Sequence, residues 1–264
     1  MKEIPNNGFI RSRSFDGSQF LLITSPALFA DVLVHRAYEF EKPFIVRKFL
    51  ARILGWGLIA SEGDQHRLQR KAMTPAFNIR NIRKLYPLMW EKSTVFTDML
   101  TREVRRTSTY PRGETGEAGT QLVGELDVCE WTSRLTLDII GPTAMGKDFQ
   151  TLQNENDTVA KNYLEIFHPS LRRMLYFVLS ISTPPWFAEW WPSSTNESIK
   201  RTVRVIRGVC LDVVREKKQE IASREQARIS FDILSSMLEG KEINDEVCVD
   251  QMLTFLAAGY VVDG

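Results

Sequence analysis

Apolar residues recur every three or four positions along most of the chain, and this is the spacing of one face of an α-helix. The pattern is clearest at residues 26–33, 79–99, 128–140 and 199–218. Near the N-terminus the pattern changes, because Phe9–Arg13 and Gln19–Ile23 flank Asp16-Gly17-Ser18, which is a turn signal. The sequence therefore predicts a mainly α fold with a small N-terminal β-hairpin.

Several helix ends are marked by specific residues. Ser25-Pro26 predicts a helix start, with serine as N-cap and proline in the first turn. Ser61 with Asp64 has the spacing of a capping box, so we expect a helix to begin near Glu62. Gly141-Pro142 is expected to end or bend the helix before it. Residues 105–124 contain four glycines and a proline, so they predict a loop.

Residues 244–264 predict the opening of a long buried helix that is apolar nearly all round, with Asp245 and Glu246 in its first turn. Such a helix needs protein on every side, and nothing follows it in this sequence. We therefore expect roughly 1,000 Å² of apolar surface to stay exposed, at a cost of about 25 cal/mol per Å². A chain of these 264 residues should then be poorly stable, and ending it at Gly240 should improve its solubility.

Charge and composition exclude some functions. The net charge of +1 argues against a nucleic-acid binder, although basic residues are frequent between Arg67 and Lys84. Cys129, Cys210 and Cys248 fit neither a disulfide framework nor zinc spacing, so we expect reduced, buried thiols. No signal peptide is apparent, and the longest apolar run, residues 174–181, is far shorter than the ~20 residues that span a bilayer. The sequence thus predicts a cytoplasmic or peripheral location.

His66 and Arg70 are one helical turn apart and share a helix face. Two hydrogen-bond donors at this spacing can bracket a pair of carboxylates on a rigid ligand, and arginine does so with a planar fork. An isolated pattern of this kind is more typical of a solvated basic face. The surrounding sequence decides between the two.

Five ordered segments give that context: Pro26–Pro43, Gly55–Asn78, Asp127–Phe149, Asn196–Ala222 and Ser230–Gly259. Together they resemble fungal members of the cytochrome P450 family, and the resemblance runs from about Gly8 to Gly259. It implies an incomplete cytochrome P450 fold, truncated in the central long helix. Residues 1–264 would form a partial P450 domain with neither an N-terminal membrane anchor nor the C-terminal haem-thiolate region.

The resemblance implies a haem cofactor. His66 and Arg70 occupy the positions that bind the haem propionates, and Ala258 and Gly259 lie on the helix that crosses the haem. No catalytic residue or metal ligand can be assigned, because the chain lacks the family's cysteine loop and its Glu-x-x-Arg motif. Valines stand at 261 and 262 where an acid–threonine pair is expected, and an unspliced intron or premature stop would explain this.

For an intact relative, the implied reaction inserts one oxygen atom from O₂ into a small organic substrate, with electrons from a P450 reductase. The family is typically found on the cytosolic face of the endoplasmic reticulum membrane. Four aromatic residues form either a packed loop floor or a contact with the membrane surface. These are Trp186, Phe187, Trp190 and Trp191.

This chain by itself is expected to be inactive. Two alternatives to an enzyme stay open: a haem-independent helical module that binds a partner through its apolar final helix, and a non-functional gene-model fragment. A basic helical nucleic-acid binder is a further, weaker alternative.

Overall fold

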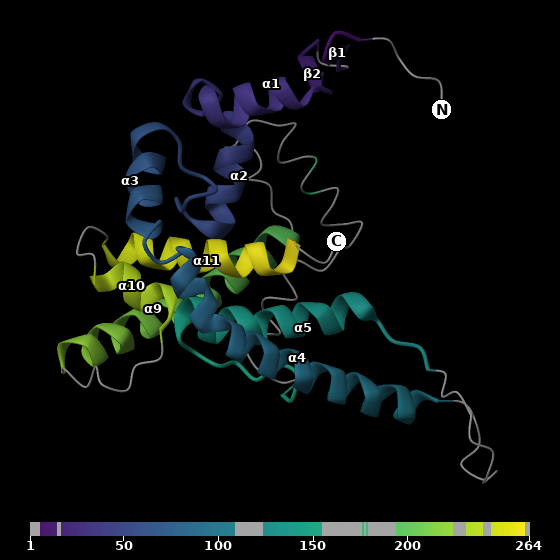
Figure 1. Ribbon diagram of the computed structural model, residues 1–264, viewed down its shortest axis with the longest axis vertical. Coiled ribbons are helices and arrows are strands. Elements are labelled where there is room, and N and C mark those ends of the chain that lie inside the picture. Colours follow the sequence, from purple (N-terminus) through teal and green to yellow (C-terminus); the bar gives the residue numbers. More distant parts are fainter. Residues whose placement is uncertain are drawn as a thin grey trace. The chain divides into compact units, whose positions relative to one another are not determined.

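The structure is a computed structural model that describes residues 6–14, 17–108, 124–154, 176, 178, 194–223, 231–239 and 244–261 (Figure 1). The chain divides into two compact units, Met1–Pro43 and Phe44–Gly264. The aromatic stretch at residues 184–192, with its expected membrane contact, lies outside the described residues. None of the described helices has the length and apolar character needed to cross a membrane.

The first unit contains the predicted β-hairpin. Strand β1 (Phe9–Arg13) pairs antiparallel with β2 (Gln19–Ile23), and Phe9 stands opposite Ile23. Gly17 has a φ of +82° next to the turn, which glycine adopts without strain. Helix α1 (Pro26–Ala30) follows, then a π-turn η1 (Asp31–His35) and a 3₁₀ turn η2 (Ala37–Glu39). The hairpin prediction is confirmed to the residue.

The second unit is helical in its described part, as the spacing of apolar residues predicts. Its elements are α2 (Phe44–Leu54), α3 (Gly63–Met73), α4 (Ile79–Thr107), α5 (Val128–Ile140), the π-turn η3 (Gly141–Met145), α9 (Ser194–Ala222), α10 (Ile233–Glu239) and α11 (Asp245–Val261). Helix α5 gives way to η3 at Gly141-Pro142, as expected. Helix α4 continues to Thr107, so the predicted loop begins later than residue 105.

Helix α11 lies at the centre of this unit, where it contacts α2, α5, α9, α10 and η3 (Figure 1). Its side chains at Cys248, Val249 and Gln251 are fully buried, and those of Met252 and Leu256 are at most 2% exposed. The expectation of a largely exposed final helix is therefore wrong. Sequence periodicity shows that α11 needs protein on all sides, but it cannot show that segments preceding α11 supply it.

Candidate functional site

Helix α3 carries the two residues expected to bind propionates. It begins after Glu62, which has the extended N-cap conformation, so the predicted start is correct. The capping box is wrong, because Ser61 is fully buried and its hydroxyl donates to Gln69 Oε1 at 3.1 Å. Ser61 thus serves the interior of the unit, where an unpaired polar group would be costly, and the first turn of α3 has no side-chain cap.

His66 and Arg70 lie one turn apart on α3, and they differ in exposure. His66 is half-buried and Arg70 is exposed. Among the residues that the structure describes, the Arg70 guanidinium has no hydrogen-bond or ion-pair partner. Arg67, between them, is bound instead to Asp64, with 3.3 Å from Nη1 to Oδ1. The Arg70 guanidinium is therefore available to donate hydrogen bonds to a carboxylate ligand, whereas that of Arg67 is engaged by Asp64.

The other expected site residues are on α11. Gln251, Phe255 and Ala258 follow the i, i+4, i+7 spacing of one helix face. Gln251 is buried, Phe255 is half-buried with its ring 5.8 Å from that of Phe77, and Ala258 is exposed. Phe77 follows α3 in the chain. This face of α11 is thus covered at its N-terminal end and opens at Ala258.

Gly259 has a different environment from Ala258. A Cβ added at Gly259 would lie 2.2 Å from Ile140 Cδ1 and 3.1 Å from Thr136 Cγ2, both on α5. The glycine therefore permits α11 and α5 to pack closely, as small residues do where helices approach. Contact of Gly259 with a cofactor stays a prediction.

A partly buried ion pair between Arg207 and Asp250, next to the segment before α3, was not foreseen from the sequence. Asp250 on α11 is 6% exposed; its Oδ1 accepts from Arg207 Nη1 at 2.6 Å, and its Oδ2 accepts from the Trp56 backbone N–H at 2.8 Å. A Cβ at Gly55, whose φ is +74°, would lie 2.0 Å from Asp250 Oδ1. Two features of the sequence could have indicated this contact. They are an acidic residue within an apolar helix and the Gly-Trp-Gly sequence before α3. The pair joins α9, α11 and the segment before α3.

The three cysteines of the chain lie in two environments. Cys210 and Cys248 are buried in the core, as expected, whereas Cys129 at the start of α5 is exposed, which corrects the prediction. Burial raises the pKa of Cys210 to about 12 despite the nearby Arg207. Burial, aided by Asp245, raises the pKa of Cys248 to about 11. Both buried thiols are therefore protonated at neutral pH and are poor metal ligands.

Thiol labelling of the native chain should distinguish these environments. We expect a maleimide or disulfide reagent to label Cys129 quickly and to label Cys210 and Cys248 only after unfolding. Folding raises the pKa of each buried thiol, so burial of the protonated thiols contributes its full share to the free energy of unfolding below the ordinary thiol pKa. This contribution is lost as the pH rises from about 9 towards 11 to 12. Rapid labelling of all three thiols at pH 7 would contradict the buried positions.

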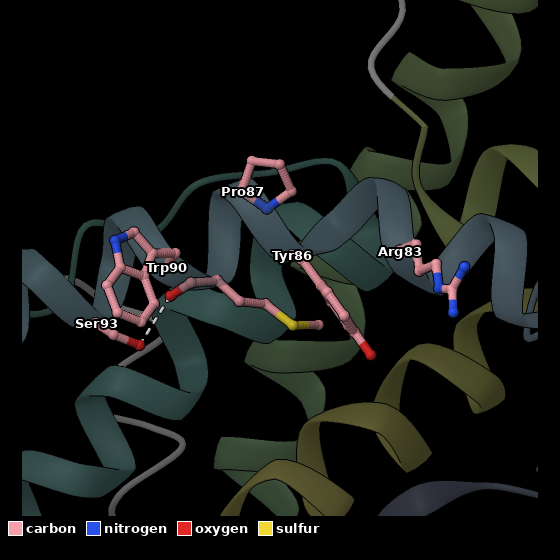
Figure 2. Close-up of a pocket in the computed structure, with 6 residues that line it drawn as sticks. Arg83, Tyr86, Pro87, Trp90 and Ser93 are labelled. Carbon is pink, nitrogen blue, oxygen red and sulfur yellow. Dashed lines mark hydrogen bonds between the residues drawn. The ribbon is translucent and has the colours of Figure 1, made fainter.

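An open hollow of about 580 Å³ lies on one side of α4. Figure 2 shows the side chains that line it, all from this one helix; they are Arg83, Tyr86, Pro87, Met89, Trp90 and Ser93. Trp90 is 77% exposed, and the hydrogen bond drawn runs from Ser93 Oγ to the Met89 carbonyl at 2.8 Å. Among the residues that the structure describes, a single helix forms the wall of this hollow, so they neither enclose a ligand nor direct several polar groups towards one. It is not a candidate active site.

Comparison with known proteins decides the family. The family model described as Cytochrome P450 matches residues 10–261. The chain belongs to the cytochrome P450 family. It is 37% identical over 264 residues to the cytochrome P450 monooxygenase ALT8 of Alternaria alternata, covering 96% of this chain and 44% of that protein. It is 36% identical over 253 residues to the cytochrome P450 monooxygenase FUM15 of Gibberella moniliformis, covering 95% and 41%.

The fold agrees with this assignment. A crystal structure of a cytochrome P450 (CYP102L1) superposes with a TM-score of 0.65 at 16% identity, over 97% of this chain and 50% of that one. The chain spans about half the length of the curated relatives that it matches. The mainly helical cytochrome P450 fold with its small hairpin is therefore confirmed, and the family implies a haem cofactor.

The residues of this chain suit the propionates and one face of a haem, and none of its cysteines supplies a ligand for the iron. The Arg70 guanidinium, which has no partner in the part of the chain that the structure describes, suits with His66 the carboxylates of the haem, and the exposed position Ala258 on α11 suits its flat face. An axial thiolate requires a deprotonated, accessible sulfur beside that face. Cys210 and Cys248 are buried and protonated, and Cys129 lies at the far end of α5 from Ile140, the α5 residue that packs on Gly259. Propionate binding by His66 and Arg70 stays a prediction, and none of the three cysteines is placed to be a thiolate ligand.

Proposed function

We propose that this chain is the part of a haem-thiolate monooxygenase that binds the haem propionates and covers one haem face. The observation that carries the proposal is the exposed guanidinium of Arg70, which has no partner among the described residues, on a helix hydrogen-bonded to the central helix α11. Family membership supplies the context. Arg70 and His66 would donate hydrogen bonds to the two propionates, and an arginine fork gives the stronger, oriented contact.

The bound haem supplies activation of dioxygen for insertion of one oxygen atom into an organic substrate. This chain's residues act around that chemistry. Ala258 would leave room for the haem because its side chain is a single methyl group at an exposed position. The buried residues at Met252, Leu253 and Leu256 keep water out of the interior behind that face. Electrons would come from a P450 reductase, and the site of action would be the cytosolic face of the endoplasmic reticulum membrane.

We further propose that the 264 residues alone do not catalyse this reaction, since none of their cysteines can provide the thiolate. The alternative function, a haem-independent partner-binding module, would need a surface other than α11, because α11 is buried. A stable folded chain without affinity for haem would favour that alternative.

Carbon-monoxide difference spectroscopy tests the proposal with two proteins. The first is the 264-residue chain supplied with haemin, which should give no band of thiolate-ligated haem. The second is a chimaera in which residues up to Gly259 replace the matched segment of the Alternaria relative, which should give that band. A thiolate band from the chain alone, or a cooperatively folded chimaera that binds no haem, would overturn the proposal.

A further inference from the structure

Two buried glutamines join the helices that carry the candidate site. Gln69 on α3 is 5% exposed, and Gln251 on α11 is fully buried. Gln251 Nε2 donates to Gln69 Oε1 at 2.9 Å, across 182 positions of sequence. Glutamine is seldom buried to this degree, and a buried amide is tolerated only when its polar atoms are paired.

The remaining polar atoms of the two amides bind the segment between α2 and α3. Gln69 Nε2 donates to the Trp56 carbonyl at 2.9 Å, and Gln251 Oε1 accepts from the Leu58 N–H at 3.1 Å. Ser61 Oγ donates to Gln69 Oε1 at 3.1 Å. The nitrogen and the oxygen of each side-chain amide therefore have a hydrogen-bond partner. Together the two amides form a continuous chain of hydrogen bonds from α11 to α3 in the interior of the unit.

Close backbone packing also brings the segment between α2 and α3 against α11. A Cβ at Gly57 would come within 2.4 Å of Thr254 Oγ1 and 2.7 Å of the Asp250 carbonyl oxygen. Asp250 also holds the Trp56 N–H. Glycine at this position allows the backbone to approach close enough for the amide hydrogen bonds to form.

We propose that Gln69 and Gln251 are positioning residues that hold the propionate-binding side of α3 in register with the open face of α11. Gln69 directly precedes Arg70 and lies one turn from His66, while Gln251 shares a helix face with Ala258. Apolar contact alone lets two helices slide or rotate, whereas paired amides fix one geometry. The identity of the ligand as haem rests on the proposed function, whereas the coupling of α3 to α11 does not depend on it.

The first measurement is amide hydrogen exchange of α3 in the 264-residue chain without haem. The variants are Gln69→Leu, Gln251→Leu and the double substitution, with Leu137→Ala on α5 as the control. Leu137 is 1% exposed on α5, which carries neither glutamine, so Leu137→Ala lowers global stability and removes no side-chain amide hydrogen bond. After correction for global stability, Gln251→Leu should raise exchange within residues 63–73 by about tenfold, although it changes no residue of α3. Leu137→Ala should leave that corrected rate unchanged.

The second measurement is the affinity of the same proteins for haemin, followed by its absorbance at a temperature where all are folded. Each single glutamine substitution should lower the affinity by about tenfold, and the double substitution by no more than either single one, because the two residues act as a unit. The control should bind as the wild type does. If a leucine variant does not fold, Gln69→Asn keeps an amide but withdraws it from Gln251, and it should show the same losses.

The outcomes separate this inference from the proposed function. Unchanged corrected exchange of α3 in the glutamine variants, or haemin affinity that falls no further than in Leu137→Ala, would overturn the positioning role. A wild-type haemin affinity that does not depend on Arg70 would overturn the propionate site. In that case faster exchange of α3 would still support the coupling of α3 to α11 through the two glutamines.

Discussion

A chain that ends at Glu239, and so lacks α11, is expected to lose cooperative unfolding of its second unit. Val249, Met252, Leu253 and Leu256 are each at most 5% exposed. Burial of one such side chain contributes about 1.5–3 kcal/mol, so the four together contribute roughly 6–12 kcal/mol. That sum is comparable with the ~5–15 kcal/mol stability of a whole domain. The deletion also removes Asp250 and Gln251, so Arg207 loses its carboxylate partner and Gln69 Oε1 loses the amide that donates to it.

Thermal and denaturant unfolding followed by circular dichroism would measure this loss. A chain that ends at Val261 retains α11 and serves as the matched control. Single substitutions on α11 refine the comparison: Leu256→Ala should cost about 2–5 kcal/mol, while Ala258→Ser, at the exposed position, should cost within about 0.5 kcal/mol. A shortened chain that melts as sharply as the control, at the same temperature, would refute the central role of α11.

The local part of the fold could be predicted from the sequence. The β-hairpin, the long helices and the start of α3 follow from turn residues and apolar periodicity, both of which act over a few positions. Ser61 shows the limit of such rules. Its spacing to Asp64 fits a capping box, yet the serine bonds Gln69 inside the unit. A tertiary partner outweighed the local preference.

The relations between helices could not be predicted. Nothing in the spacing of Gln69 and Gln251 marks them as partners, since the pattern around each gives only its own helix face. The same limit explains the errors at α11 and Cys129. Periodicity showed that α11 is apolar all round and placed Cys129 in an apolar stretch, but burial depends on which segments fold over them. The family resemblance supplied the candidate site, and the structure shows the hydrogen bond that joins the two helices on which its residues lie.

Arg70→Ala is expected to lower haem affinity of the chimaera by at least tenfold, and Arg67→Ala by less than about twofold. The two arginines belong to one helix and differ in what they bind. Arg70 has no partner among the described residues, so a propionate would gain its full charge-assisted hydrogen bonds, about 1.5–3 kcal/mol. Arg67 already pairs with Asp64, and its side chain is 63% exposed, where an ion pair contributes at most about 1 kcal/mol.

The rate of haem transfer from each variant to an apo-globin acceptor would measure this difference. Arg70→Lys provides the test of geometry: it keeps the positive charge and loses the planar fork, so its rate should fall between those of the wild type and Arg70→Ala. Both arginine variants should melt as the wild type does in the absence of haem, because neither side chain belongs to the core. Equal haem loss from Arg67→Ala and Arg70→Ala would show that general positive charge on α3, and not the face shared by His66 and Arg70, retains the haem.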